Sequence, residues 1–108
     1  MRKPPCEWRI RNIVPLIRAT LATLLIKEYG LSIYQAAKIL DVTPAAISNY
    51  LALRRPKVKI IDKLLNDPVV VSHFRDLARK LLDNEVEAGD VICELCQKFT
   101  DYLRNLMS

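Results

Sequence analysis

The chain has 108 residues, of which 51% are hydrophobic, and it contains only two glycines and six prolines. This length fits one domain, or a small domain with an extension, and the hydrophobic content excludes a disordered chain. So few glycines and prolines leave little room for the many tight turns of an all-β fold, and we therefore predict an all-α fold. The net charge of +5 is uneven, since residues 1–59 carry +8 and residues 60–108 carry −3. A basic front half suits a polyanionic partner, whereas an acidic rear half suits protein or solvent.

The sequence also argues against several classes of protein. The first residues, Met1 to Trp8, contain no apolar run, so we do not interpret them as a signal peptide. No stretch reaches the ~18 apolar residues of a membrane span, and we expect a cytoplasmic protein without a membrane partner. With one histidine, no glycine-rich phosphate loop and no converging carboxylates, the chain offers no catalytic set, so we do not expect an enzyme.

Apolar residues spaced three and four apart predict a first helix over about 14–29, which Gly30 ends. A second helix is expected over 33–40. Ser32 is a suitable N-cap for it, and Gln35 three residues later completes the pattern of a capping box.

The third helix is predicted to begin with Thr43 as its N-cap and Pro44 at its first position. We expect it to continue to about Leu53. Pro56 should end it, because proline cannot extend the hydrogen-bond ladder of a helix.

Three further helices are predicted in the rear half, over about 58–65, 68–84 and 90–106. Asp67 followed by Pro68 repeats the combination of cap and proline at a helix start. The last helix carries apolar residues spaced 3, 4, 3 and 4, as in a short coiled-coil seam: Ile92, Leu95, Phe99, Tyr102 and Leu106.

The second and third helices have the pattern of a helix-turn-helix. Ala37 is small enough for the two helices to approach closely, and Asp41 tolerates the left-handed backbone that the turn requires. Val42 is expected to fill the corner, and Ile47 to anchor the third helix. Tyr50 and Leu51 should close the buried side of that helix. Any small helical bundle could contain a capped turn and an alanine, but the cap, turn, anchor and basic exit occur here together.

This spacing resembles the lambda-repressor-like, or XRE-type, helix-turn-helix family, closely over residues 31–55. The whole chain is also similar to a group of short archaeal predicted transcriptional regulators. The matching residues are Pro5-Cys6-Glu7 at the start and Cys93-Glu94-Leu95-Cys96 in the last helix. The resemblance implies an all-α, lambda-repressor-like helix-turn-helix bundle, which we place at residues 1–66, with a C-terminal helical extension at 67–108.

The resemblance also implies which residues meet double-stranded DNA. The family reads bases with the start and outward face of the third helix, which here are Thr43, Pro44, Ala45, Ser48 and Asn49. An asparagine can pair with adenine through two hydrogen bonds, but the set lacks the arginine that contacts guanine most strongly. We therefore expect modest base readout.

Contacts to DNA phosphates are expected from the N-terminus of the second helix and from the basic run after the third. The candidates are Ser32, Tyr34, Gln35, Lys38, Arg54, Arg55, Lys57 and Lys59. The alternative for the basic run is a solvated charged surface with no ligand.

A small DNA-binding module usually dimerises, so we take the apolar seam of the last helix as the candidate dimer interface. The alternative is that this seam packs on the core of its own chain. The expected function is a homodimeric DNA-binding transcriptional regulator. The alternative function is a protein-interaction or antitoxin-like adaptor on the same fold, without specific DNA binding.

The three cysteines leave several arrangements open. Cys93 and Cys96 are neighbours on one side of a helix, off the apolar seam, and with Cys6 they could bind zinc or an iron–sulfur cluster. His73 could complete a zinc site, although it is more simply an ordinary helical residue. A disulfide from Cys6 to the last helix is a second arrangement, and three free thiols are a third. We expect no cofactor.

Overall fold

The computed structural model describes residues 13–52 and 55–107, with only the backbone described for 55–58 and 106–107. This part of the chain is helical and contains no strand, which confirms the predicted all-α fold. The helices are α2 (Val14–Lys27), α3 (Ile33–Leu40), α4 (Pro44–Leu51), α5 (Arg55–Asn66), α6 (Pro68–Leu82) and α7 (Ala88–Met107). This order of helices is consistent with the predicted lambda-repressor-like helix-turn-helix bundle and its C-terminal helical extension.

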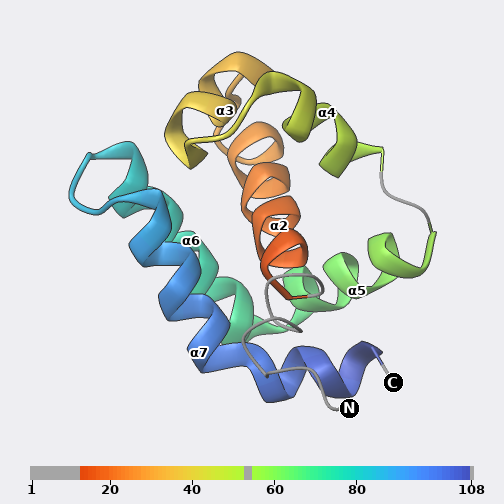
Figure 1. The fold of residues 1–108 in the computed structure, drawn as a ribbon. Coiled ribbons are helices and arrows are strands. Elements are labelled where there is room, and N and C mark those ends of the chain that lie inside the picture. Colours follow the sequence, from red (N-terminus) through yellow and green to blue (C-terminus); the bar gives the residue numbers. More distant parts are fainter. Residues whose placement is uncertain (1–12, 53–54, 108) are drawn as a thin grey trace, which may run out of the picture.

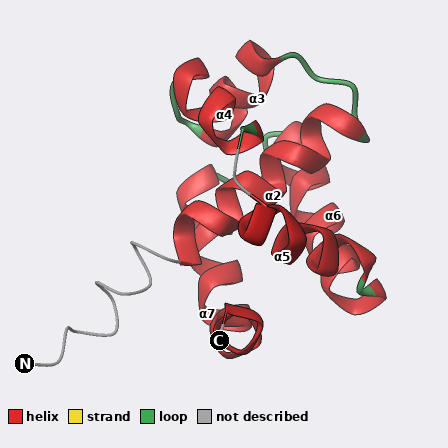
Figure 2. Cartoon of the chain, turned by 90° about the vertical axis from the view of Figure 1, so that its right-hand side faces the viewer, coloured by secondary structure: helices red, strands yellow, loops and turns green. Residues whose placement is uncertain are grey.

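The central element of the bundle is α2, which contacts each of the other five described helices. Figures 1 and 2 show α3 and α4 together at one end of the molecule, with α7 towards the opposite end. More than half of α2 is buried, because apolar or small residues lie on most of its sides: Leu16, Ile17, Ala19, Thr20, Leu21, Ala22, Leu24 and Leu25. A helix that is apolar nearly all round is stable only inside a core, which is where the fold places it.

The first helix ends two residues earlier than the apolar spacing predicts. It stops at Lys27, and Glu28 is its C-cap. Gly30 then takes a left-handed conformation with φ +69°, which glycine adopts without steric cost. This turn redirects the chain into α3.

The boundary between α4 and α5 also differs from the prediction. The third helix ends at Leu51 rather than Leu53, and α5 begins at Arg55 rather than near Val58. Pro56 therefore lies in the first turn of α5 instead of ending α4. A proline is tolerated there because the first N–H groups of a helix have no partner within the helix.

A tight turn joins α6 to α7. Asn84 is left-handed with φ 58°, and its N–H donates to the carbonyl of Leu81 at 3.2 Å. The N–H of Glu85 donates to the carbonyl of Lys80 at 2.9 Å, which completes a Schellman motif. This turn ends α6 at Leu82, before the predicted Asn84, and α7 begins at Ala88, before the predicted Asp90.

The apolar seam of α7 packs on the core of its own chain. Ile92, Leu95 and Phe99 are buried, and the Phe99 ring lies 5.9 Å from that of Phe74 on α6. The candidate dimer interface therefore needs correction, because these three side chains have no surface left for a second copy. Tyr102 is half-buried and also packs on the core, and the side chain of Leu106 lies outside the described residues.

Polar contacts join α6 and its N-cap to the end of α2 and to α7. The Arg75 guanidinium donates to the two Glu28 carboxylate oxygens at 2.9 Å and 2.7 Å, and this hydrogen bonding lowers the pKa of Glu28. At the start of α6, the Asp67 carboxylate accepts from the N–H groups of Val69 and Val70. Its second oxygen accepts from the Tyr102 hydroxyl of α7 at 3.0 Å.

Among the described residues, no helix is both long enough and apolar enough to cross a bilayer.

Candidate functional site

The turn between α3 and α4 has the geometry that the sequence predicts. Asp41 is left-handed with φ 56° and ψ 47°. The N–H of Asp41 donates to the carbonyl of Lys38 at 3.3 Å, and the N–H of Val42 donates to that of Ala37 at 3.0 Å. These two bonds satisfy the carbonyls at the end of α3, so the chain reverses within three residues.

Side chains cap the N-termini of both helices. Ser32 Oγ accepts from the Gln35 N–H at 3.1 Å, and Gln35 Oε1 accepts from the Ser32 N–H at 2.9 Å, which confirms the capping box. Thr43 Oγ1 accepts from the Ala46 N–H at 3.1 Å, as predicted. Both helix starts are therefore fixed by contacts within three residues.

The inner face of α4 packs through one fully buried side chain. Ile47 is the only residue described as buried in this helix, with 0% exposure. Ala36 and Ala37 are buried on α3, where their small size allows α4 to pack closely. Tyr50 is half-buried against the core, as predicted, but Leu51 is 40% exposed. Because α4 ends at Leu51, this side chain does not close the buried side, and that prediction is wrong.

The outer face of α4 brings together all five residues predicted to read bases. Each of them is exposed: Thr43, Pro44, Ala45, Ser48 and Asn49. Within the part of the chain that the structure describes, the Ser48 and Asn49 side chains form no hydrogen bond. Their polar groups can therefore bind a ligand without breaking an internal contact.

The eight candidates for phosphate contacts fall into two groups, four in α3 or its N-cap and four after α4. Ser32, Tyr34, Gln35 and Lys38 are all exposed on the first half of the helix-turn-helix, with Tyr34 at 75%. The capping box occupies one acceptor of Ser32 and one of Gln35, but it leaves the Gln35 amide NH₂ as a donor.

The remaining phosphate candidates follow α4. Lys59 is exposed on α5. Arg55 and Lys57 lie in α5 as well, with side chains outside the described residues, and Arg54 lies outside them entirely. From Arg55 onward, the basic exit is thus part of the next helix.

The cysteines do not share one environment. Cys93 is exposed, whereas Cys96 is buried in the core at 7% exposure, which corrects the prediction that both lie off the apolar seam. The His73 ring packs on Phe99 at 5.7 Å, and its Nδ1 lies 3.4 Å from the Lys98 ammonium. The described residues hold no group of three histidine, cysteine or acidic side chains suited to a metal. Cys6 lies outside the described residues, so any shared site or disulfide with it stays a prediction.

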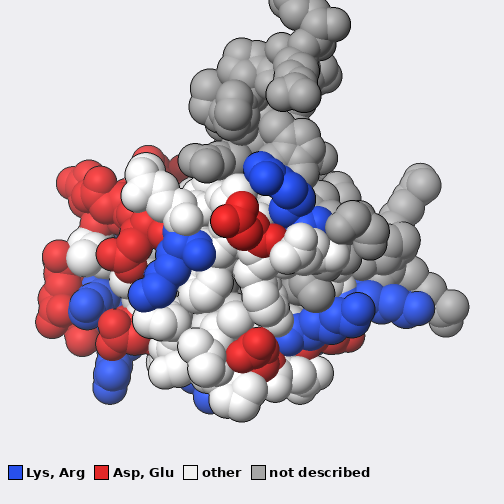
Figure 3. All heavy atoms as spheres, turned by 90° about the horizontal axis from the view of Figure 1, so that it is seen from below, with Lys and Arg blue, Asp and Glu red and all other residues white. Residues whose placement is uncertain are grey.

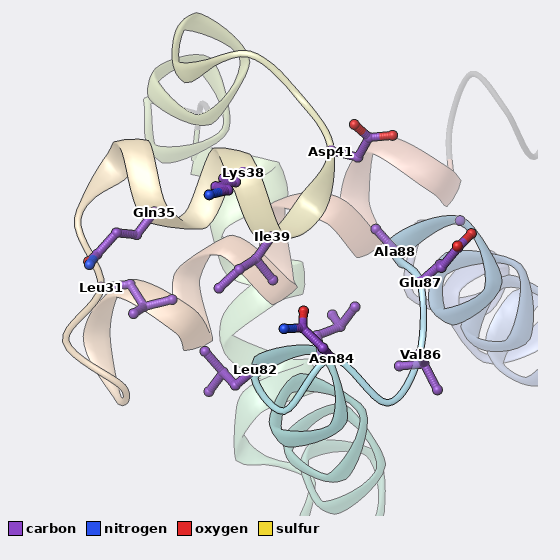
Figure 4. A pocket seen from close by; sticks show the side chains of 12 residues that line it. Leu31, Gln35, Lys38, Ile39, Asp41, Leu82, Asn84, Val86, Glu87 and Ala88 are labelled. Atoms are coloured by element: carbon purple, nitrogen blue, oxygen red, sulfur yellow. The ribbon is translucent and has the colours of Figure 1, made fainter.

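Sequence reasoning missed a groove of about 730 Å³ between α3 and the turn that joins α6 to α7. Half-buried aliphatic side chains form much of its lining, and Figure 4 shows Ile39 and Leu82 pointing into it from opposite sides. Two of its other lining residues, Gln35 and Lys38, are also phosphate candidates. The two walls are at least 40 residues apart in the chain, so no local pattern could reveal the groove.

A comparison with family models matches residues 22–67 to the helix-turn-helix family. The matched family is the XRE-type helix-turn-helix, and the match covers less than half of the chain. The match runs from the second half of α2 to the N-cap of α6, so α6 and α7 lie outside it. This is a family of DNA-binding regulatory domains, which are not typically enzymes. Searches of curated proteins and of solved structures find no match. The wider likeness to short archaeal regulators stays a prediction.

Proposed function

We propose that this protein is a DNA-binding transcriptional regulator that acts as a homodimer and inserts α4 into the major groove of DNA. The observation that carries the proposal is the exposure of the whole outer face of α4, while Ile47 is buried in the core on the opposite side and Tyr50 packs beside it. A helix held in this way presents its N-terminal residues to base edges, as helix-turn-helix proteins require.

On this proposal, Asn49 and Ser48 supply the polar contacts to bases. The Asn49 amide can donate to N7 and accept from N6 of adenine, or contact either group alone, and the Ser48 hydroxyl can serve a base or a phosphate. Ala45 presents a methyl group that can contact the methyl of thymine. Because no arginine lies on this face, base readout contributes modestly and phosphate contacts contribute much of the affinity.

Phosphates are bound from both ends of the motif. At the start of α3, Ser32, Tyr34 and the Gln35 amide lie beside backbone N–H groups, whose dipoles favour an anion. Lys38 and Lys59 are exposed and form no ion pair with another described residue, so neither must break an internal contact to bind a phosphate.

The test is fluorescence anisotropy with a labelled duplex selected from a random pool, measured over a series of salt concentrations. Replacing Lys38 or Lys59 with alanine should weaken binding to every duplex and reduce the salt slope by about 1 for each lysine. Lys80→Ala is the control and should leave the slope unchanged, because it removes a half-buried lysine of α6 that pairs with Asp76 outside the helix-turn-helix.

The base contact is tested separately. Asn49→Ala should lose ~1–3 kcal/mol on the selected duplex and almost nothing on unrelated duplexes. An equal loss on every duplex would refute the role of Asn49. The absence of binding even at low salt would refute the whole proposal and favour a protein-interaction adaptor on the same fold.

A further inference from the structure

Five of the nine acidic residues of the rear half lie in or close to the α6–α7 turn, which forms one wall of the groove. From Leu81 to Gln97 the chain carries five acidic residues and no basic one. All five are exposed, and none forms an ion pair with another described residue: Asp83, Glu85, Glu87, Asp90 and Glu94. Figure 3 shows acidic side chains concentrated on the left, where Figure 1 places this turn.

The groove itself combines this charge with an apolar lining. Leu31 and Ile39 contribute from one wall and Leu82 and Val86 from the other, and each is only half-buried. Glu87 lines the groove beside them. Asp41 and Lys38 line it too, so the charged lining is net negative by one, and the exposed acidic residues of the α6–α7 turn add to this charge. A ligand with both apolar side chains and positive charge complements this surface, and these are the properties of a basic amphipathic segment.

The sequence of this chain contains such a segment in its first 12 residues. They hold four basic residues and one acidic residue, and the run Trp8-Arg9-Ile10-Arg11 alternates apolar and basic side chains. In an extended chain, alternate side chains point to opposite sides. Trp8 and Ile10 can then contact the aliphatic lining while the two arginines pair with the acidic rim, where guanidinium and carboxylate bind through two hydrogen bonds.

We propose that this groove binds residues 1–12 of a second copy of the chain. Ile13 lies at one end of α2, whereas the groove lies near the other end, beside Leu31 (Figure 1). The 14 residues of α2 span about 21 Å at 1.5 Å per residue. Trp8 is five residues from Ile13 and reaches at most about 18 Å. The N-terminal arm (residues 1–12) of the same chain could bring Trp8 to the groove only if it were fully stretched along α2, whereas the arm of a second copy is not tethered in this way.

Exchange of two arms gives a closed, symmetric dimer, because each copy donates one segment and accepts one. This contact replaces the buried α7 seam as the interface of the proposed homodimer. The inference rests on the homodimer of the proposed function but not on DNA binding, and it is tested without DNA. A monomeric chain would overturn both the exchange of arms and the homodimer, whereas a dimer that resists the charge reversals would overturn the exchange of arms alone.

The experiment is sedimentation velocity on the full chain under reducing conditions, so that Cys93 cannot link two copies through a disulfide. Arg9→Glu/Arg11→Glu reverses the charge of the arm, and Glu85→Lys/Glu87→Lys reverses the rim of the groove. Each pair should raise the dimer dissociation constant by on the order of tenfold or more, since like charges then face each other. The variant that carries all four changes should dimerise again, as should an equimolar mixture of the two double variants.

Asp62→Lys/Asp76→Lys is the matched control, since it makes the same charge change at exposed sites outside the groove. It should leave the dissociation constant unchanged. Circular dichroism on every variant checks that the helical fold is kept.

Trp8 provides an independent measurement because it is the only tryptophan. Its fluorescence emission should shift to shorter wavelength as the wild-type chain dimerises, and the arm and rim variants should keep the emission of exposed tryptophan. A wild-type chain that stays monomeric at all concentrations overturns the proposal, whatever its emission. A dimer that resists both charge reversals, or a four-change variant that stays monomeric, overturns it as well.

Discussion

Replacing Ile47 with alanine tests the anchor on which the position of α4 depends. Ile47 is fully buried and is the only residue of α4 described as buried, while the five candidate base contacts lie on the opposite, exposed face. If α4 is held to the core by this side chain, its truncation should destabilise the fold and loosen the recognition surface together.

The size of the effect follows from the burial of the side chain. The substitution removes three carbon atoms, and burial is worth ~0.8 kcal/mol for each, which gives about 2 to 3 kcal/mol. The cavity that remains adds to this loss, so we expect about 3 to 4 kcal/mol in the free energy of unfolding. For a domain of this size, that loss corresponds to a fall in Tm of roughly 12 to 25 °C.

The assay is urea denaturation followed by circular dichroism, with Leu51→Ala as the matched control in the same helix. Leu51 is 40% exposed, so its truncation should cost less than about 1 kcal/mol. A loss for Ile47→Ala no larger than that for Leu51→Ala would refute the reasoning, because α4 would then not depend on this buried contact.

Three further predictions concern the turn, the start of α6 and the thiols. Asp41→Gly should keep or slightly raise the Tm, because glycine adopts φ 56° freely, whereas Asp41→Val should lower it. Hydrogen bonds from the Val70 N–H and the Tyr102 hydroxyl lower the pKa of Asp67. The contribution of Asp67 to stability should therefore be complete above about pH 5 and should disappear as the pH falls through the lowered pKa. Tm measured against pH should show a weaker acid dependence for Tyr102→Phe than for the wild-type chain, and an unchanged dependence would contradict this contact. In thiol titration Cys93 should react rapidly and Cys96 only on unfolding, so equal rates would contradict the burial of Cys96.

The parts of the site that the sequence predicts correctly depend on contacts within a few residues. Ser32 and Gln35 cap α3 through a three-residue spacing, and Asp41 reverses the chain with bonds to the last turn of the same helix. Such interactions are encoded locally, so their residue types and spacing are sufficient to predict them. The exposed face of α4 follows as well, once Thr43 fixes where that helix begins.

The errors occur where one local pattern allows two structures. Pro56 can end one helix or begin the next. In the structure it lies at the start of α5, and α5 packs against α2. The α7 seam has the spacing of a dimer interface, but Phe74 and the rest of the core cover it within the same chain.

The helical class, the caps and turn of the helix-turn-helix, and the residues on the outer face of α4 can therefore be read from the order of the amino acids. The buried apolar faces and the position of the groove, as between Ile39 of α3 and Leu82 of α6, become visible only when the helices are packed together. This difference arises because helix capping is satisfied within one turn of the chain, whereas burial depends on packing between helices far apart in sequence.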